Sequence, residues 1–170
     1  MGMTKAIPVA VFALIMAGCG GEQKAAPVEE TASKLDAGLY ELTAEVTQLD
    51  STDNTKPATA LKLGDKQVIK ACVLADGKPT PELLAEQGDK CEVKNSYIRN
   101  GRMSVEMSCT RTNPSGPVMP AMNGSFKADS FEGEITTMTY FYKSGDYRLS
   151  RKVNAKRVGD CPAGGAAEKA

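Results

Sequence analysis

CEVKNSYIRNGRMSVEMSCTR, residues 91–111, is the stretch that decides the fold. Asn100-Gly101 lies at its centre, and Asn-Gly between two alternating runs is the strongest local signal for a tight β-hairpin turn. In the second arm, apolar side chains occupy every other position from 103 to 109, which is the pattern of a half-buried strand. We therefore expect two antiparallel strands here, over residues 91–98 and 102–111.

The register of this hairpin has two solutions. A two-residue turn pairs Ile98 with Met103. A three-residue turn with Gly101 in the left-handed conformation pairs Tyr97 with Met103 and Cys91 with Cys109. A β-bulge would reconcile either choice, so the register stays open at this point.

Alternating runs on both sides of the hairpin predict further strands over residues 40–47, 66–74, 121–128, 131–142 and 147–157. Residues 112–120 are rich in proline and glycine and are expected to form a loop, and the apolar parity changes between Ile135 and Met138, which suggests a bulge or a barrel corner. The pattern predicts an all-β domain with one short helix. Its architecture is an antiparallel up-and-down meander of about seven strands, forming a curved sheet or a half-open barrel.

The one helix is expected at Thr80–Gly88, TPELLAEQG. Thr80 suits the N-cap, Pro81 the first turn and Gly88 the position after the last turn. A helix of about two turns is stable only when it is packed against something else.

The N-terminal residues have the layout of an export signal. Lys5 provides a positive charge, residues 6–16 are apolar, and Met16-Ala17-Gly18-Cys19 resembles a bacterial lipobox, in which cleavage precedes a lipidated cysteine. We expect a lipoprotein signal peptide at 1–18, lipidation of Cys19, a flexible tether at 19–36, a β domain at 37–161 and a disordered tail at 162–170.

This layout places the protein in the cell envelope, anchored to the membrane by lipid. Acyl chains hold a protein on a membrane through the burial of their methylene groups. Gly20 stands where lipoproteins retained in the inner membrane typically carry Asp, which favours the periplasmic face of the outer membrane.

Composition argues against several classes of function. Without Lys5, 20 Lys and Arg remain against 21 Asp and Glu, so no strong field draws the chain to nucleic acid. The chain has no His, which removes the imidazole base and the usual nucleophile pairs of hydrolases. We expect a protein that is not an enzyme and that needs no cofactor.

Four cysteines remain after Cys19, and an even number in an exported protein predicts two disulfides. A zinc site would need close pairs, which the spacing does not provide. Of the three possible connectivities we prefer Cys72–Cys91 with Cys109–Cys161, because Cys72 precedes the helical segment and Cys91 follows it. The alternative that we weigh against it pairs Cys91 with Cys109.

The four cysteines after Cys19, the strand sequences around them and the end of the last strand together resemble the domain of unknown function family 3617. The resemblance extends from about residue 35 to 162, and its most specific part is the ordered cysteines with the closing sequence KRVGDC, residues 156–161. It implies an exported, often lipidated, small antiparallel β domain, and it implies no activity. The loop at residues 50–62 lacks the methionines that such proteins often carry there.

We therefore expect a non-catalytic domain that binds an apolar small molecule or an envelope protein on the concave side of its sheet. The alternative is a Cu(I)-binding envelope protein that uses methionine thioethers, above all Met119 and Met122. Methionines also serve as core residues, which is the simpler explanation for the others. The final strand is rich in Lys and Arg, which could contact an acidic partner or lipid headgroups but is also typical of a protected edge strand.

Overall fold

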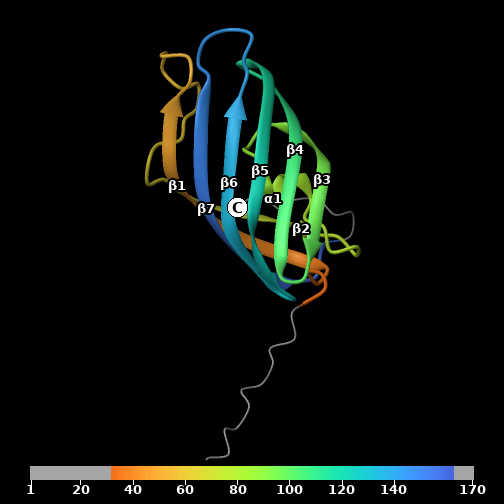
Figure 1. Ribbon diagram of the computed structural model, residues 1–170. Helices are drawn as coiled ribbons and strands as arrows, with labels where there is room; N and C mark the ends of the chain where they lie inside the picture. The colour runs from red at the N-terminus through yellow and green to blue at the C-terminus, as the bar shows by residue number, and fades with distance from the viewer. Residues whose placement is uncertain (1–31, 163–170) are drawn as a thin grey trace, which may run out of the picture.

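The computed structural model describes residues 32–162 (Figure 1). The expected signal segment, Cys19, most of the tether and all but the first residue of the tail lie outside the described residues. No helix in this part of the chain is long and apolar enough to cross a membrane. In chain order the elements are β1 (Gly38–Ser51), β2 (Lys66–Val73), α1 (Pro81–Leu84), β3 (Lys90–Arg99), β4 (Arg102–Thr112), β5 (Ser115–Lys127), β6 (Ser130–Thr139) and β7 (Tyr147–Gly159).

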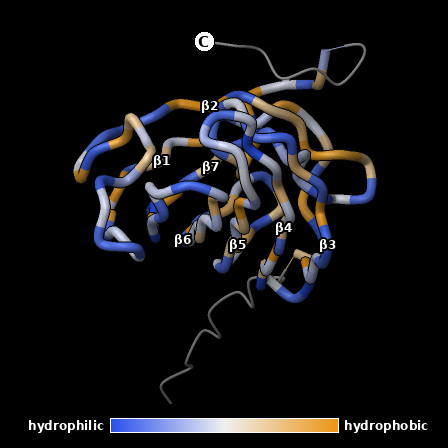
Figure 2. Tube along the Cα trace, turned by 90° about the horizontal axis from the view of Figure 1, so that it is seen from above, coloured by the Kyte–Doolittle hydropathy of each residue, from blue (hydrophilic) through white to orange (hydrophobic). Residues whose placement is uncertain are grey.

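The seven strands form one antiparallel sheet in the order β2-β1-β7-β6-β5-β4-β3. Strands β3 to β7 run up and down in sequence, and the β1–β2 hairpin joins the sheet beside β7. Figure 2 shows that the sheet is curled, with hydrophilic and hydrophobic residues alternating along its strands. The predicted all-β meander is confirmed, and its form is a half-open barrel with β2 and β3 as the two edges.

The inner face of the curled sheet forms the core. In β1 the alternating apolar residues Tyr40, Leu42, Ala44 and Val46 are at most 2 % exposed. Leu35 precedes the sheet and Leu83 and Leu84 lie on α1, and all three are fully buried in the same cluster. The concave side is therefore filled by the chain's own side chains, and burial of this apolar surface provides the main stabilisation of the fold.

The register of the β3–β4 hairpin combines both sequence-based solutions. Ile98 pairs with Met103 around a two-residue turn, in which Asn100 and Gly101 both have positive φ angles, 53° and 70°. This is the backbone that favours Asn-Gly in hairpins. A bulge between Val93 and Asn95 then shifts the register by one residue, so that Cys91 lies opposite Cys109.

The preferred disulfide pairing was wrong. The structure joins Cys91 to Cys109 and Cys72 to Cys161, so all four cysteines are paired but not as Cys72–Cys91 and Cys109–Cys161. Leu39 explains the second bond, because it pairs with Cys72 on one side and with Gly159 on the other. The end of β7 thus lies near β2, with a Cα–Cα distance of 5.9 Å between Cys72 and Cys161.

Two further expectations differ from the structure. Most of the proline-rich segment at 112–120 is not a loop, because β5 begins at Ser115 and includes Pro117 and Pro120. No register shift occurs where the apolar parity changes after Ile135. Instead, the inward positions of β6 continue with Thr137 and Thr139, which are buried although polar.

Candidate functional site

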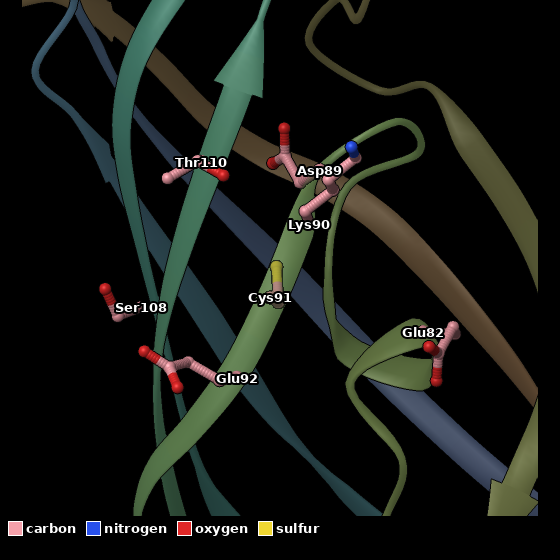
Figure 3. A pocket seen from close by; sticks show the side chains of 7 residues that line it. All are labelled: Glu82, Asp89, Lys90, Cys91, Glu92, Ser108 and Thr110. Atoms are coloured by element: carbon pink, nitrogen blue, oxygen red, sulfur yellow. The ribbon is translucent and has the colours of Figure 1, made fainter.

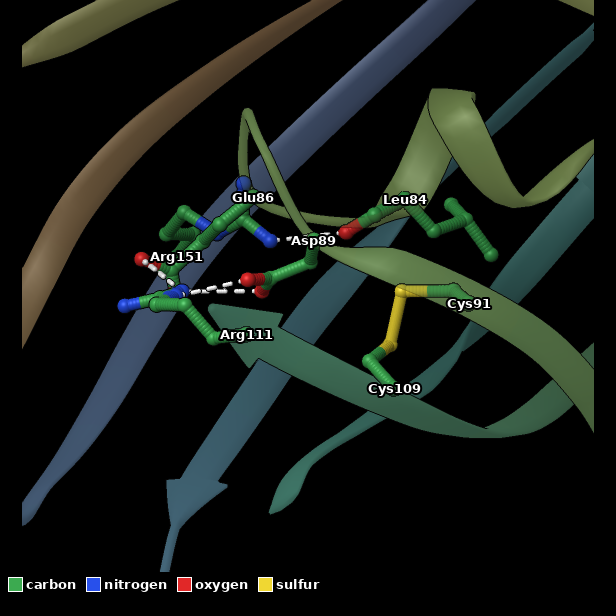
Figure 4. Close-up of a disulfide and its surroundings, with 7 residues drawn as sticks. All are labelled: Leu84, Glu86, Asp89, Cys91, Cys109, Arg111 and Arg151. Atoms are coloured by element: carbon green, nitrogen blue, oxygen red, sulfur yellow. Dashed lines mark hydrogen bonds and ion pairs between the residues drawn. A yellow bond between two sulfur atoms is a disulfide. The ribbon is translucent and has the colours of Figure 1, made fainter. Parts of the chain in front are cut away.

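Four charged side chains and one tyrosine meet on the concave side of the half-barrel, and we call them the arginine cluster: Arg111, Arg151, Glu86, Asp89 and Tyr147. Figure 4 shows the four charged members. Arg111 extends from the end of β4, and its Nε and Nη2 donate to the two carboxylate oxygens of Asp89 at 2.6 and 2.8 Å. Its Nη1 donates to the Tyr147 hydroxyl at 2.7 Å, although β4 and β7 are separated in the sheet by β5 and β6. The contact therefore spans the inside of the curve.

Glu86 completes this network. The Tyr147 hydroxyl donates to Glu86 Oε2 at 2.9 Å, and Arg111 Nη2 lies 3.2 Å from the same oxygen. The side chains of Arg111 and Glu86 are only 11 % and 7 % exposed, and that of Asp89 is fully buried. Two guanidinium groups and two carboxylates make the cluster neutral as a whole. Neutral pairing of this kind reduces the large penalty for burying charges.

Arg151 is the less satisfied of the two arginines. It lies on the inward face of β7, between Val46 and Ile135 of the neighbouring strands, and is 1 % exposed. Its Nη2 donates to the Leu84 carbonyl at 2.7 Å. Among the buried side-chain atoms of the described residues, those without a hydrogen-bond partner are Arg151 Nε and Nη1, Glu86 Oε1 and Thr137 Oγ1. The inside of the barrel therefore holds unused donors, which are costly to bury.

We name residues 78–87 the α1 segment. It connects the two edge strands of the sheet and contacts both β2 and β3, so it covers the opening of the half-barrel. The helix is shorter than the expected Thr80–Gly88, because Arg151 binds the Leu84 carbonyl that a longer helix would need for its own hydrogen bonding. After Leu84 the backbone of Ala85 is extended, and the next residue, Glu86, lies against Arg111 and Tyr147.

The electrostatics of the cluster follow from burial and pairing. Burial lowers the pKa of the Arg111 guanidinium, but its hydrogen bonds to Asp89 and the charge of Glu86 raise that pKa above its ordinary value overall. Burial holds the pKa of Arg151 below its ordinary value. Burial, followed by the charge of Glu86, raises the pKa of Tyr147. The charge of Arg111 is thus balanced by its contacts, whereas Arg151 keeps two nitrogens without a hydrogen-bond partner.

The Cys91–Cys109 disulfide lies directly beside the cluster (Figure 4). Cys91 faces Cys109 across β3 and β4, and the Asp89–Arg111 ion pair is two residues further along the same two chain segments. Side chains two residues apart on a strand share a face. The disulfide therefore fixes the two backbones whose next inward side chains are Asp89 and Arg111.

A shallow groove of about 560 Å³ passes over edge strand β3 beside the disulfide (Figure 3). Figure 3 shows Glu82 on the α1 side of β3 and Ser108 and Thr110 on β4 on the other side. Its charged side chains are Glu82, Asp89, Lys90 and Glu92. Asp89 is already paired with Arg111, and Glu92 is paired with Lys94, so these two carboxylates of the groove already have basic partners.

The structure separates the two methionines of the copper hypothesis. Met122 points into the core and is 1 % exposed, whereas Met119 is 50 % exposed on the outer face of β5. They therefore cannot bind one ion together. Met119 instead lies directly opposite Met138 of β6. Within the described residues, no group of three or more His, Cys, Asp or Glu side chains is placed to hold a metal ion.

The basic residues of the final strand divide between the two faces. Lys152 and Lys156 are exposed on the outer face, opposite Glu45 and Glu41 of β1. The strand is not an edge, since β1 and β6 pair with its two sides. Arg151, another basic residue of this strand, points inward instead. Along the strand it alternates in step with Tyr147, Leu149 and Val153, and this alternation could have identified Arg151 as an inward residue from the sequence.

Comparison with known proteins identifies a family and nothing more specific. The model of the family described as "Protein of unknown function (DUF3617)" matches residues 35–161. Neither the curated proteins nor the solved structures contain a match to this chain.

Proposed function

The chain belongs to the DUF3617 family, and from that premise we propose that it is a lipid-anchored, non-catalytic protein of the cell envelope that binds a small ligand inside its half-barrel. One observation carries the proposal: two buried arginines and a tyrosine converge behind the opening of the sheet, under the α1 segment, whose helix is a single turn. The two Arg151 nitrogens without a hydrogen-bond partner support this proposal, because buried polar groups in folded proteins are normally paired.

The direction of the chain is consistent with an anchored binding domain. Ala32 accepts a hydrogen bond from Gly101 N at 3.3 Å, so the described chain enters the domain beside the β3–β4 turn. Arg111 lies at the other end of β4. In this proposal Cys19 carries the lipid on the periplasmic face of the outer membrane, and the arginine cluster lies at the end of the domain away from the point where the anchored chain enters.

The anchor and the ligand require separate experiments. Metabolic labelling with a radioactive fatty acid is expected to label the wild-type protein and not Cys19→Ser. For the ligand, we would export residues 20–170 to the periplasm behind a non-lipoprotein signal and record native mass spectra before and after denaturation. A bound mass that is lost on denaturation supports a ligand-binding function, and a protein that is always empty contradicts it.

A copper-binding function is the second candidate, and the Met119–Met138 pair on the outer face favours it. Thioether sulfur is a ligand that Cu(I) prefers. Native mass spectra with added Cu(I) are expected to show stoichiometric uptake that is lost in Met119→Leu and Met138→Leu but kept in Met122→Leu. Uptake that depends on Met122 would contradict this assignment.

A further inference from the structure

The α1 segment has the chemical form of an amphiphile. Leu83 and Leu84 are fully buried in the apolar core. Two residues later, the carboxylate of Glu86 accepts a hydrogen bond from Tyr147 and lies against Arg111. An apolar part and an anionic head thus enter the half-barrel together, with the head at the arginines.

Residues 78–80 of the segment are tied to the end of β2, because Leu74 N donates to Lys78 O and Thr80 N donates to Cys72 O. From Pro81 onward the backbone hydrogen bonds of the segment include Leu83 N to Thr80 O and Ala85 N to Pro81 O, which are local and belong to no sheet. A single helical turn has little stability of its own. Gly77 and Gly88 flank the segment with φ angles of 83° and 93°, a conformation that glycine adopts readily and other residues rarely. Gly88 can therefore act as a hinge for residues 81–87, whereas Gly77 lies in the turn that ties residues 78–80 to β2.

Displacement of the segment would keep the charges of the cluster in balance. Asp89 lies beyond the Gly88 hinge, next to β3, and would stay paired with Arg111. Only Glu86 would leave, together with the Leu84 carbonyl bound by Arg151. One incoming carboxylate would replace one outgoing carboxylate, and it would meet Arg111, Tyr147 and the unused nitrogens of Arg151.

We propose that the α1 segment is an internal substitute for a long-chain carboxylate, and that such a ligand binds by displacing it. The carboxylate head takes the place of Glu86 between Arg111, Tyr147 and Arg151, and the acyl chain takes the space now filled by Leu83 and Leu84. This inference rests on the proposed ligand-binding function and specifies its site, its ligand class and its mode of entry.

The test uses oleate with residues 20–170 exported with both disulfides formed. Isothermal titration calorimetry is expected to give one oleate per chain and much weaker binding of oleyl alcohol, which lacks the carboxylate. Glu86→Gln weakens the internal competitor and is expected to bind oleate roughly tenfold more tightly, because hydrogen bonds to charged groups are the stronger ones. The matched control is Glu82→Gln, on the same segment but facing the outer groove, which should bind as the wild type does.

Two further measurements separate this site from any other. Arg151→Met replaces the guanidinium with an apolar side chain and is expected to lose at least about tenfold in oleate affinity, because the charged donors that would bind the carboxylate are gone. Since this change leaves one buried carboxylate of the cluster uncompensated, urea unfolding first checks that the variant is folded. Oleate should also speed hydrogen exchange in the peptide that covers residues 78–87, because displacement breaks the Leu83 and Ala85 amide hydrogen bonds.

The outcomes distinguish the inference from the function on which it rests. Oleate binding with faster exchange at 78–87 and tighter binding by Glu86→Gln supports the inference. Equal binding of oleyl alcohol, unchanged exchange, or no oleate binding by either the wild type or Glu86→Gln overturns it. If a different mass still co-purifies in the native spectra, the ligand-binding function stands without this ligand class.

Discussion

Removing the two disulfides one at a time should destabilise the domain by different amounts. The Cys72–Cys161 bond closes a sequence separation of 89 residues, and the Cys91–Cys109 bond one of 18. In the chain-entropy treatment, the entropy that a cross-link removes from the unfolded chain is a constant plus a term that grows with the logarithm of the loop length, which gives about 4.6 kcal/mol for the long loop and about 3.2 kcal/mol for the short one. The difference of about 1.4 kcal/mol is the predicted quantity.

The pair of double variants is well matched for this measurement. Cys72→Ala/Cys161→Ala and Cys91→Ala/Cys109→Ala each remove one cysteine that is 1 % exposed and one that is partly exposed. Losses of packing should therefore be similar, and the difference should come from the loop lengths. The assay is urea unfolding of the exported domain, with the free energy of unfolding extrapolated to water and the m-value compared between variants.

Two results would refute this reasoning. If the Cys91/Cys109 variant is the less stable of the two, local support of the Asp89–Arg111 pair outweighs chain entropy. If mass spectrometry of proteolytic peptides from the wild type finds Cys72 linked to Cys91, the topological premise itself is wrong, because the structure gives these cysteines different partners.

Three further predictions concern polar groups. Tyr147→Phe removes the hydroxyl between Arg111 and Glu86 and should lower the free energy of unfolding, measured in urea, by about 1–3 kcal/mol. The control is the same change at exposed Tyr140, which should alter that free energy by less than about 0.5 kcal/mol. Burial raises the pKa of Tyr40 to about 12 from 10.0. The neutral phenol therefore contributes its full stabilisation of the fold below pH 10, and this contribution is lost as the pH rises to about 12. The free energy of unfolding, measured across that range, should fall more steeply in the wild type than in Tyr40→Phe. Hydrogen bonds from Thr55, and from the Gly145 and Asp146 amides, hold the pKa of Asp53 well below its ordinary value. These bonds therefore stabilise the fold fully at a pH above the ordinary pKa, and their contribution is lost as acid protonates the carboxylate. Asp53→Asn at neutral pH should speed hydrogen exchange at Gly145, and unchanged exchange would count against this role of Asp53.

The sequence was sufficient for the sheet because binary patterning and turn chemistry agree along most of it. Asn100-Gly101 specifies a two-residue turn, and the alternation in β1 and β4 specifies which side chains face inward. Where these local signals conflict, prediction failed. Pro117 and Pro120 suggested a loop because proline cannot donate to a sheet, yet both lie in β5.

The disulfide pairing could not be predicted because it depends on long-range register. The bulge between Val93 and Asn95 moves Cys91 by one position relative to β4, and no turn signal marks a bulge within a strand. Cys161 meets Cys72 only because β1 lies between β2 and β7, which is a property of the sheet order. Proximity along the chain, which had favoured Cys72–Cys91, carries no information about that order.

The arginine cluster was hidden by the same patterning that revealed the sheet. Arg151 occupies an inward position of β7, with Leu149 and Val153 as its nearest neighbours on that face, but composition grouped it with the exposed lysines. Glu86 was assigned to a regular helix, and nothing in that helix indicated a contact with Tyr147 of β7 or Arg111 of β4. A charged residue at an inward position of a strand must find partners inside the barrel, and in this chain those partners come from the segment that covers the opening. An inward arginine and a short acidic segment between edge strands should therefore be considered together when such a sequence is analysed, because the buried guanidinium needs a partner and the covering segment can supply one.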